Sequence, residues 1–270
     1  MAAALDSGAV TPETTYENTG SVQIGAYTIS NTLQQYNGVR TMVDVLRYSL
    51  NTGAVFAGER TGNAAFRAYM EAFGLGKPTG IALPEEAGGS LANLAAGRPI
   101  NYATAAFGQG ISVTPLQLIA AIGAIANGGT LMKPTIVESI AYPNGEYEEF
   151  SPVEIRRVIQ QRTATRVAAM MTRVVEDGSG VRAKIPGYTI AGKTGTAQIP
   201  NVGTPGYGAD TIHTFVAFFP AFDPQYIILT KVDRPQARYA ESTAVPLFRR
   251  LAEYLITYAA IPPDQPIPSD

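Results

Sequence analysis

Three strand-like segments follow one another in the last third of the chain, and this run constrains the fold more than any other feature. Each is rich in β-branched and aromatic residues. The link 222–225 is short, and consecutive strands with short links favour an antiparallel sheet. Polar residues do not alternate with Val216, Phe218 and Phe219, and such an apolar run is typical of a strand that is covered on both faces. The predicted strands of this sheet are residues 188–199, 211–222 and 226–233, and a further short strand is predicted at 27–29.

Sequence patterns typical of helices precede the predicted sheet, and one further helix is predicted after it. Thr114, Pro115 and Gln117 form the strongest start, because threonine caps a helix, proline suits its first position and glutamine completes a capping box. Thr41 with Asp44 is a weaker pair of the same kind. The predicted helices are residues 1–6, 41–50, 62–73, 115–127, 163–176 and 243–258.

These patterns predict an α+β fold, with an antiparallel sheet of about three strands packed against a helical region and a C-terminal helix. The helical region spans about 1–178, and the sheet with its terminal helix spans about 186–258. We expect one domain over 1–262 and a loose, proline-rich tail over 263–270.

Composition excludes several functions. The 270 residues hold 20 Lys and Arg against 22 Asp and Glu, a net charge of −2, which argues against nucleic-acid binding. The chain has no cysteine and a single histidine, His213, so we expect no metal site and no cofactor held by such residues. No apolar run is long enough to span a bilayer, and no targeting signal is present.

The residues Lys193–Thr196, with sequence KTGT, form the sharpest local feature. An edge strand with a cation and two hydroxyls can bind an extended peptide, and Lys193, Thr194 and Thr196 could hold its terminal carboxylate. Gly192 and Gly195 suggest that another backbone approaches the strand closely. The alternative is a strand weakened by glycine with an exposed lysine. A P-loop is excluded, because no glycine-rich loop precedes the lysine.

Weaker candidates lie elsewhere. Ser49 and Asn51 place a hydroxyl and an amide near a predicted helix end, where they can face one cleft or simply cap the helix. His213 stands in an apolar strand and is expected to be a hydrogen-bonded core residue. Glu85 and Glu86 are expected to be solvated loop residues rather than an acid–base pair.

Read in order, the motifs resemble the transpeptidase domain of penicillin-binding proteins, closest to the monofunctional class B enzymes. They are Ser49-x-Asn51, FGQGISVTPLQ at 107–117 and KTGT at 193–196. The resemblance implies a β-lactamase-like fold and a D,D-transpeptidase that cross-links peptidoglycan. Its partners would be stem peptides and β-lactams, at the extracytoplasmic face of the bacterial inner membrane.

The resemblance also implies residue roles. Ser49 would relay a proton to the leaving amine, Lys193 would support it electrostatically, and Asn51 would bind the substrate amide. The strand segment Thr194, Gly195 and Thr196 would bind substrate. Its two hydroxyls would hold the carboxylate, and the Thr196 N–H would form part of the oxyanion hole.

The family's nucleophile is missing from this chain. Ser-x-x-Lys requires a serine three residues before a lysine, and these positions hold Gly74, Thr130, Val181, Ile190 and Ile228. We expect a domain cut inside its catalytic helix, with Met1–Gly8 continuing that helix, and therefore a chain that is inactive alone. The absent N-terminal piece or a second copy would cover the sheet's exposed flank. A non-catalytic sensor and a serine β-lactamase are the alternatives.

Overall fold

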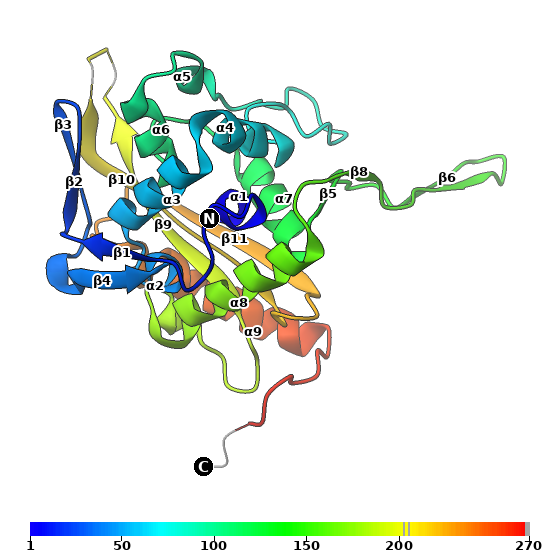
Figure 1. The fold of residues 1–270 in the computed structure, drawn as a ribbon. Coiled ribbons are helices and arrows are strands. Elements are labelled where there is room, and N and C mark those ends of the chain that lie inside the picture. The colour runs from blue at the N-terminus through cyan, green and yellow to red at the C-terminus, as the bar shows by residue number, and fades with distance from the viewer. Residues whose placement is uncertain (202, 205, 268–270) are drawn as a thin grey trace.

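A three-stranded antiparallel sheet lies at the centre of the computed structural model, which describes residues 1–201, 203–204 and 206–267 (Figure 1). Its order is β11–β10–β9, so β9 is an edge strand of the described sheet. The strands are β9 (Ala191–Pro200), β10 (Tyr207–Phe219) and β11 (Tyr226–Asp233). All three predicted strands are confirmed, as is their antiparallel arrangement. Positions 202 and 205, in the predicted link between the first two, lie outside the described residues.

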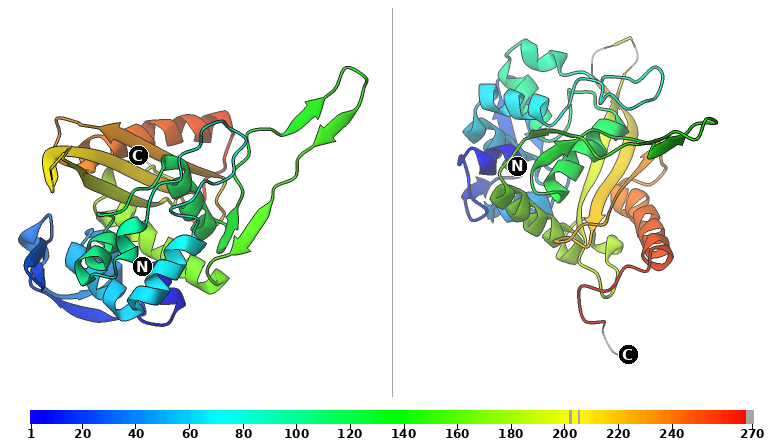
Figure 2. Two further views of the ribbon diagram at one scale, coloured as in Figure 1. Left: turned by 90° about the horizontal axis from the view of Figure 1, so that it is seen from above. Right: turned by 90° about the vertical axis from the view of Figure 1, so that its right-hand side faces the viewer.

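Residues 215–219 of β10 are buried on both faces, as this apolar run predicted. Phe215 and Phe219 belong to one core with Val245 and Phe248 of α9 (Ala244–Tyr258). Phe218 belongs to a second core, formed by residues of the preceding helices. Figure 2 shows α9 on one side of the sheet and most of the other helices on the opposite side. The α+β class is therefore confirmed.

The remaining helices precede the sheet. The capping boxes predicted at Thr41 with Asp44 and at Thr114 with Gln117 are both present. The α-helices are α1 (Ala2–Asp6), α2 (Met42–Arg47), α3 (Asn51–Thr61), α4 (Asn63–Ala72), α5 (Ala92–Ala95), α6 (Pro99–Ala106), α7 (Pro115–Ala126) and α8 (Gln161–Asp177). Three short 3₁₀ turns are η1 (Gln34–Tyr36), η2 (Val181–Ala183) and η3 (Ala240–Ser242).

Helix α3 is an element that the sequence did not predict. Two glycines and two threonines weaken its local helix propensity. Its stability comes from packing: a Cβ on Gly53 would overlap the Val45 side chain of α2 and lie 2.8 Å from the Tyr16 hydroxyl. The absent side chain lets α3 approach α2 closely, so tertiary contact overrides propensity here.

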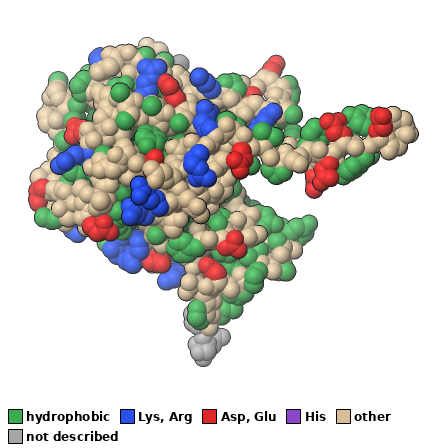
Figure 3. All heavy atoms as spheres, turned by 45° about the vertical axis from the view of Figure 1, so that its right-hand side comes forward, with side chains coloured by type: hydrophobic (Ala, Val, Ile, Leu, Met, Phe, Trp, Pro, Cys, Tyr) green, Lys and Arg blue, Asp and Glu red, His purple; other side chains and the backbone are tan. Residues whose placement is uncertain are grey.

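In the part of the chain that the structure describes, four small strand pairs complete the fold, and of their strands only β3 was predicted. The pairs are β1 (Thr15–Asn18) with β4 (Gly38–Thr41), β2 (Ser21–Ile24) with β3 (Tyr27–Ser30), β5 (Thr130–Met132) with β8 (Glu154–Arg157), and β6 (Ser139–Ala141) with β7 (Tyr147–Glu149). The β6–β7 hairpin extends away from the body, and Figure 3 shows hydrophobic and acidic side chains along it.

The chain is hydrogen-bonded to the body at the start of the predicted tail, which was expected to be loose over 263–270. Tyr188 donates from its hydroxyl to the Ile261 carbonyl at 2.8 Å. The Thr189 N–H donates to the Asp264 carboxylate at 2.8 Å. Residues 268–270 of the predicted tail lie outside the described residues. Within the described residues, no helix has the length and apolar character needed to cross a membrane.

Candidate functional site

The two motifs with predicted chemistry meet at the edge of the sheet. The Lys193 Nζ on β9 donates to the Ser49 Oγ at 2.7 Å and to the Thr194 carbonyl at 2.8 Å. Ser49 and Lys193 are 144 positions apart in the chain. The helical region thus presents a hydroxyl to a cation on the sheet, as the spacing of the motifs alone could not show.

Ser49 is held in an uncommon backbone conformation at the joint between α2 and α3. Its φ of 56° lies in the left-handed region, which non-glycine residues seldom occupy. The adjacent Leu50 is buried and its N–H donates to the Val45 carbonyl at 3.0 Å. Backbone in this region persists only where the surroundings enforce it, and it concentrates at functional sites.

Asn51 opens α3, two residues after Ser49. Its side-chain Nδ2 donates to the Ser30 carbonyl at the end of β3, at 2.9 Å. The structure therefore orients this amide through the β2–β3 hairpin.

A buried polar network lies beneath the start of α3. The Asn31 Oδ1 accepts from the Thr52 N–H at 3.0 Å, and the Thr52 hydroxyl donates to the Asn18 Oδ1 at 2.9 Å. The Asn31 Nδ2 also donates to the Asn18 Oδ1 at 2.9 Å. The sequence analysis missed these residues, because no local pattern marks three polar side chains from separate segments as one buried cluster.

Burial changes the pKa of the Lys193 side chain. Loss of solvent lowers the pKa of Lys193 from its ordinary 10.5 to about 8, because water no longer stabilises the ammonium. The Glu241 carboxylate on η3 opposes this shift electrostatically. At neutral pH the side chain is mostly protonated, so it is a hydrogen-bond donor and a cation that an anionic ligand can use.

The rest of the KTGT segment faces the turn between α8 and η2 on one side and η3 on the other. The Thr194 Oγ1 lies 2.8 Å from the Ser179 Oγ, and the Thr196 Oγ1 accepts from the Ala240 N–H at 3.4 Å. The sequence analysis did not predict a role for Ser179. Its one signal was a hydroxyl between two glycines just after a helix.

The glycines of this strand have a different cause from the predicted one. A Cβ on Gly192 would lie 2.6 Å from the Phe215 ring, and a Cβ on Gly195 would overlap the Thr214 hydroxyl. The close neighbours are therefore side chains of β10, not an approaching backbone. The aromatic core beneath β9 requires glycine at position 192.

The other candidates stay outside this site. His213 is fully buried and hydrogen-bonds to the hydroxyls of Thr211 at 3.1 Å and Thr243 at 2.9 Å, as expected of a core histidine. Glu86 was expected to be merely solvated, but it accepts from the Thr79 N–H at 2.7 Å and the Gly80 N–H at 2.9 Å. It therefore organises its own loop. No group of three metal-ligating side chains was found in the part of the chain that the structure describes.

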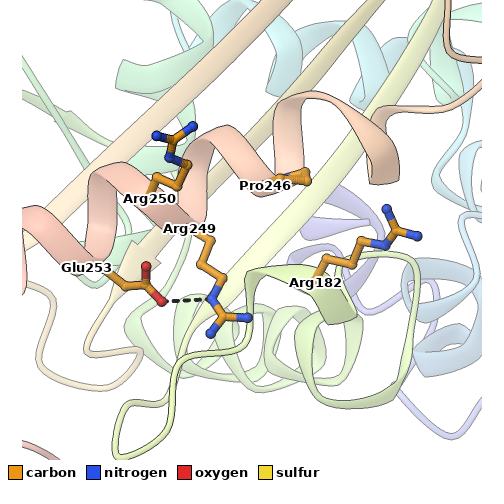
Figure 4. A pocket seen from close by; sticks show the side chains of 5 residues that line it. All are labelled: Arg182, Pro246, Arg249, Arg250 and Glu253. Atoms are coloured by element: carbon orange, nitrogen blue, oxygen red, sulfur yellow. Dashed lines mark hydrogen bonds and ion pairs between the residues drawn. The ribbon is translucent and has the colours of Figure 1, made fainter.

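A basic hollow lies in the surface beside α9. Arg182, Pro246, Arg249, Arg250 and Glu253 line it (Figure 4). Arg249 is paired with Glu253 at 2.8 Å, and the three guanidinium groups point in different directions. They do not converge on one ligand position, so we place the candidate site at Ser49 and Lys193.

Known proteins resemble the whole arrangement. The model of the penicillin-binding protein transpeptidase domain matches residues 1–253. Penicillin-binding protein PbpB of Mycolicibacterium smegmatis is 34% identical over 273 residues, which is 97% of this chain and 42% of that protein. The probable peptidoglycan D,D-transpeptidase FtsI of Caulobacter vibrioides is 29% identical over 252 residues, 87% of this chain and 40% of that protein.

A solved structure gives the same picture. Penicillin-binding protein 3 of Mycobacterium tuberculosis, complexed with aztreonam, superposes with a TM-score of 0.90 at 32% identity, covering 98% of this chain and 62% of that one. The chain spans about two fifths of the length of the two curated relatives. Because the family model covers residues 1–253 and a relative is 34% identical over 97% of the chain, the chain belongs to the penicillin-binding protein transpeptidase domain family.

Proposed function

We propose that this chain forms the substrate-binding part of a D,D-transpeptidase that acts on peptidoglycan stem peptides at the extracytoplasmic face of the bacterial inner membrane. Residues 1–262 would form its single domain. The observation that carries the proposal is the 2.7 Å contact between the Lys193 Nζ and the Ser49 Oγ. It brings two separate family motifs together beside an edge strand, where an extended peptide can pair with the backbone.

In this proposal the edge strand holds the ligand by its carboxylate. The Lys193 ammonium supplies the charge, and the hydroxyls of Thr194 and Thr196 supply hydrogen bonds. Gly195 keeps the strand free of a side chain between them. A D-Ala-D-Ala terminus and the carboxylate of a β-lactam share this anionic group, so both fit one site.

The remaining roles concern acyl transfer. Ser49 would pass a proton to the leaving amine, while the neighbouring ammonium of Lys193 favours the serine's anionic form. Asn51 would hydrogen-bond the substrate amide, and the Thr196 N–H would stabilise the oxyanion. Acyl transfer also needs an attacking hydroxyl, and none of the five lysines follows a serine at the required spacing. We therefore propose that this chain binds ligand without being acylated.

Intact mass spectrometry after incubation with benzylpenicillin tests the last point. We expect an unchanged mass, and a stoichiometric adduct would overturn the proposal that the chain lacks a nucleophile. Binding is tested separately by calorimetric titration with a peptide ending in D-Ala-D-Ala and with its C-terminal amide.

We expect the free acid to bind at least about tenfold more tightly than the amide, since a charged hydrogen-bonded pair is lost with the amide. Lys193→Gln should abolish the preference. Lys231→Gln on β11 is the matched control, because Lys231 pairs with Asp233 rather than with the site. Equal affinity of the wild-type chain for acid and amide would refute the proposed carboxylate site.

A further inference from the structure

We infer that Ser179 is a positioning residue that makes the Thr194 hydroxyl a hydrogen-bond donor to the ligand carboxylate. The inference rests on the proposed function and adds a residue to it. The key distance is 2.8 Å between the Ser179 Oγ and the Thr194 Oγ1.

The direction of the hydrogen bonds follows from counting protons. A threonine hydroxyl has one proton to donate and can accept through its oxygen. The Lys193 Nζ already points a donor at the Thr194 Oγ1 from 3.4 Å. If the Thr194 proton goes to a carboxylate, the proton between the two hydroxyls must come from Ser179. The chain of bonds then runs from Ser179 to Thr194 to the ligand, and each bond strengthens the next.

Ser179 is fixed in place from both sides. Its N–H donates to the Arg47 carbonyl at 3.0 Å, just before the Ser49 joint. The Arg47 guanidinium pairs with Asp177 at 2.8 Å, which ties the end of α2 to the end of α8. Ser179 therefore contacts α2 through its backbone N–H and β9 through its side-chain hydroxyl.

The flanking glycines show that this junction is tightly packed. A Cβ on Gly178 would overlap the Arg47 carbonyl and lie 2.9 Å from the Val174 carbonyl. A Cβ on Gly180 would lie 3.1 Å from the Phe215 ring. The backbone on both sides of Ser179 is therefore held close to its neighbours, which fixes the position from which the Ser179 hydroxyl reaches Thr194. A pre-oriented donor loses less entropy when the ligand binds.

The test compares acid and amide forms of the D-Ala-D-Ala peptide in four proteins: wild type, Ser179→Ala, Ser179→Thr and Ser7→Ala. We expect Ser179→Ala to reduce the affinity for the acid about three- to tenfold and to leave the affinity for the amide unchanged. Ser179→Thr keeps the hydroxyl, so this variant should retain the wild-type preference for the acid over the amide. Ser7→Ala removes a serine hydroxyl that bonds only to the local Ala4 carbonyl at 3.3 Å, so it should change neither affinity.

The outcomes separate this inference from the proposed function. If wild type prefers the acid and Ser179→Ala keeps the same ratio, Ser179 has no role in presenting Thr194. An equal loss for acid and amide means that Ser179 is only structural, which also overturns the inference. If wild type shows no preference for the acid, the carboxylate site itself fails, and the inference fails with it.

Discussion

The Lys193 ammonium donates to the Ser49 hydroxyl over 2.7 Å, although the two residues come from the sheet and from a helix joint 144 positions away. The contact affects the stability of the fold, because the Lys193 ammonium is largely removed from water. Burial lowers the pKa of Lys193 to about 8. Below that pH the folded protein carries the full cost of a desolvated charge.

Replacing Lys193 should therefore stabilise the fold while it removes ligand binding. We expect Lys193→Met to raise the free energy of unfolding at pH 7 by about 1–3 kcal/mol, as in other replacements of buried charges by apolar residues. Between about pH 8 and 10.5 the unfolded chain binds more protons at this position than the folded one, so wild-type stability rises with pH. The advantage of the variant should shrink over that interval.

Urea denaturation at pH 7 and pH 10 measures both effects, with the partly exposed Lys231→Met as the control. A Lys193→Met variant that is less stable than wild type at pH 7 would mean that the hydrogen bonds of Lys193 outweigh its desolvation.

Two helical glycines should respond oppositely to alanine. Gly123 in α7 has no atom within 4 Å of an added Cβ, so Gly123→Ala should stabilise by about 0.5–1 kcal/mol through better helix propensity. Gly53→Ala in α3 has the same propensity gain, but its methyl overlaps Val45. We expect a net loss of about 1–3 kcal/mol from overpacking.

Thermal and urea unfolding of the two variants form a matched pair. Equal stabilisation of both would show that α3 can move away from α2 at little cost.

The network under α3 should be sensitive to the loss of one amide. Asn31→Ala removes the acceptor of the buried Thr52 N–H and one of the donors to the Asn18 Oδ1, which leaves the Thr52 N–H without its acceptor. We expect a loss of about 2–3 kcal/mol in the free energy of unfolding. Gln23→Ala is the control on the same hairpin: Gln23 also makes hydrogen bonds, at 3.0 and 2.7 Å, but it is exposed and should change stability by less than about 0.5 kcal/mol. Similar losses in the two variants would argue against a special role of the network.

The single histidine offers a clean pH test. Burial lowers the pKa of His213 below its ordinary 6.5. As the pH falls through 6.5, the unfolded chain gains a proton before the folded chain does, so stability is lost on the acidic side. His213→Gln should lose less stability than wild type between pH 7 and pH 5.5. Since no other histidine is present, the wild-type ring signals in an NMR titration report this residue directly. Parallel stability curves for the two proteins would show that the ring titrates normally.

Local signals in the sequence determined a large part of this fold. The capping residues Thr41 and Thr114 begin helices independently of the tertiary structure, because each side chain accepts a hydrogen bond from the backbone N–H three positions later. The apolar run of β10 required cover on both faces, and the structure provides it. The order of the Ser49, 107–117 and Lys193 motifs was sufficient to indicate the family.

Only the tertiary structure decided the site itself. Helix α3 depends on the close approach at Gly53, which overrides a weak local propensity. The Ser179–Thr194 and Asn31–Thr52 hydrogen bonds and the distance from Ser49 to Lys193 join residues that are 15, 21 and 144 positions apart. Local periodicity reports which face of an element is apolar. It carries no information on how two elements pack, and that packing sets the burial of Lys193 and the direction of each hydroxyl.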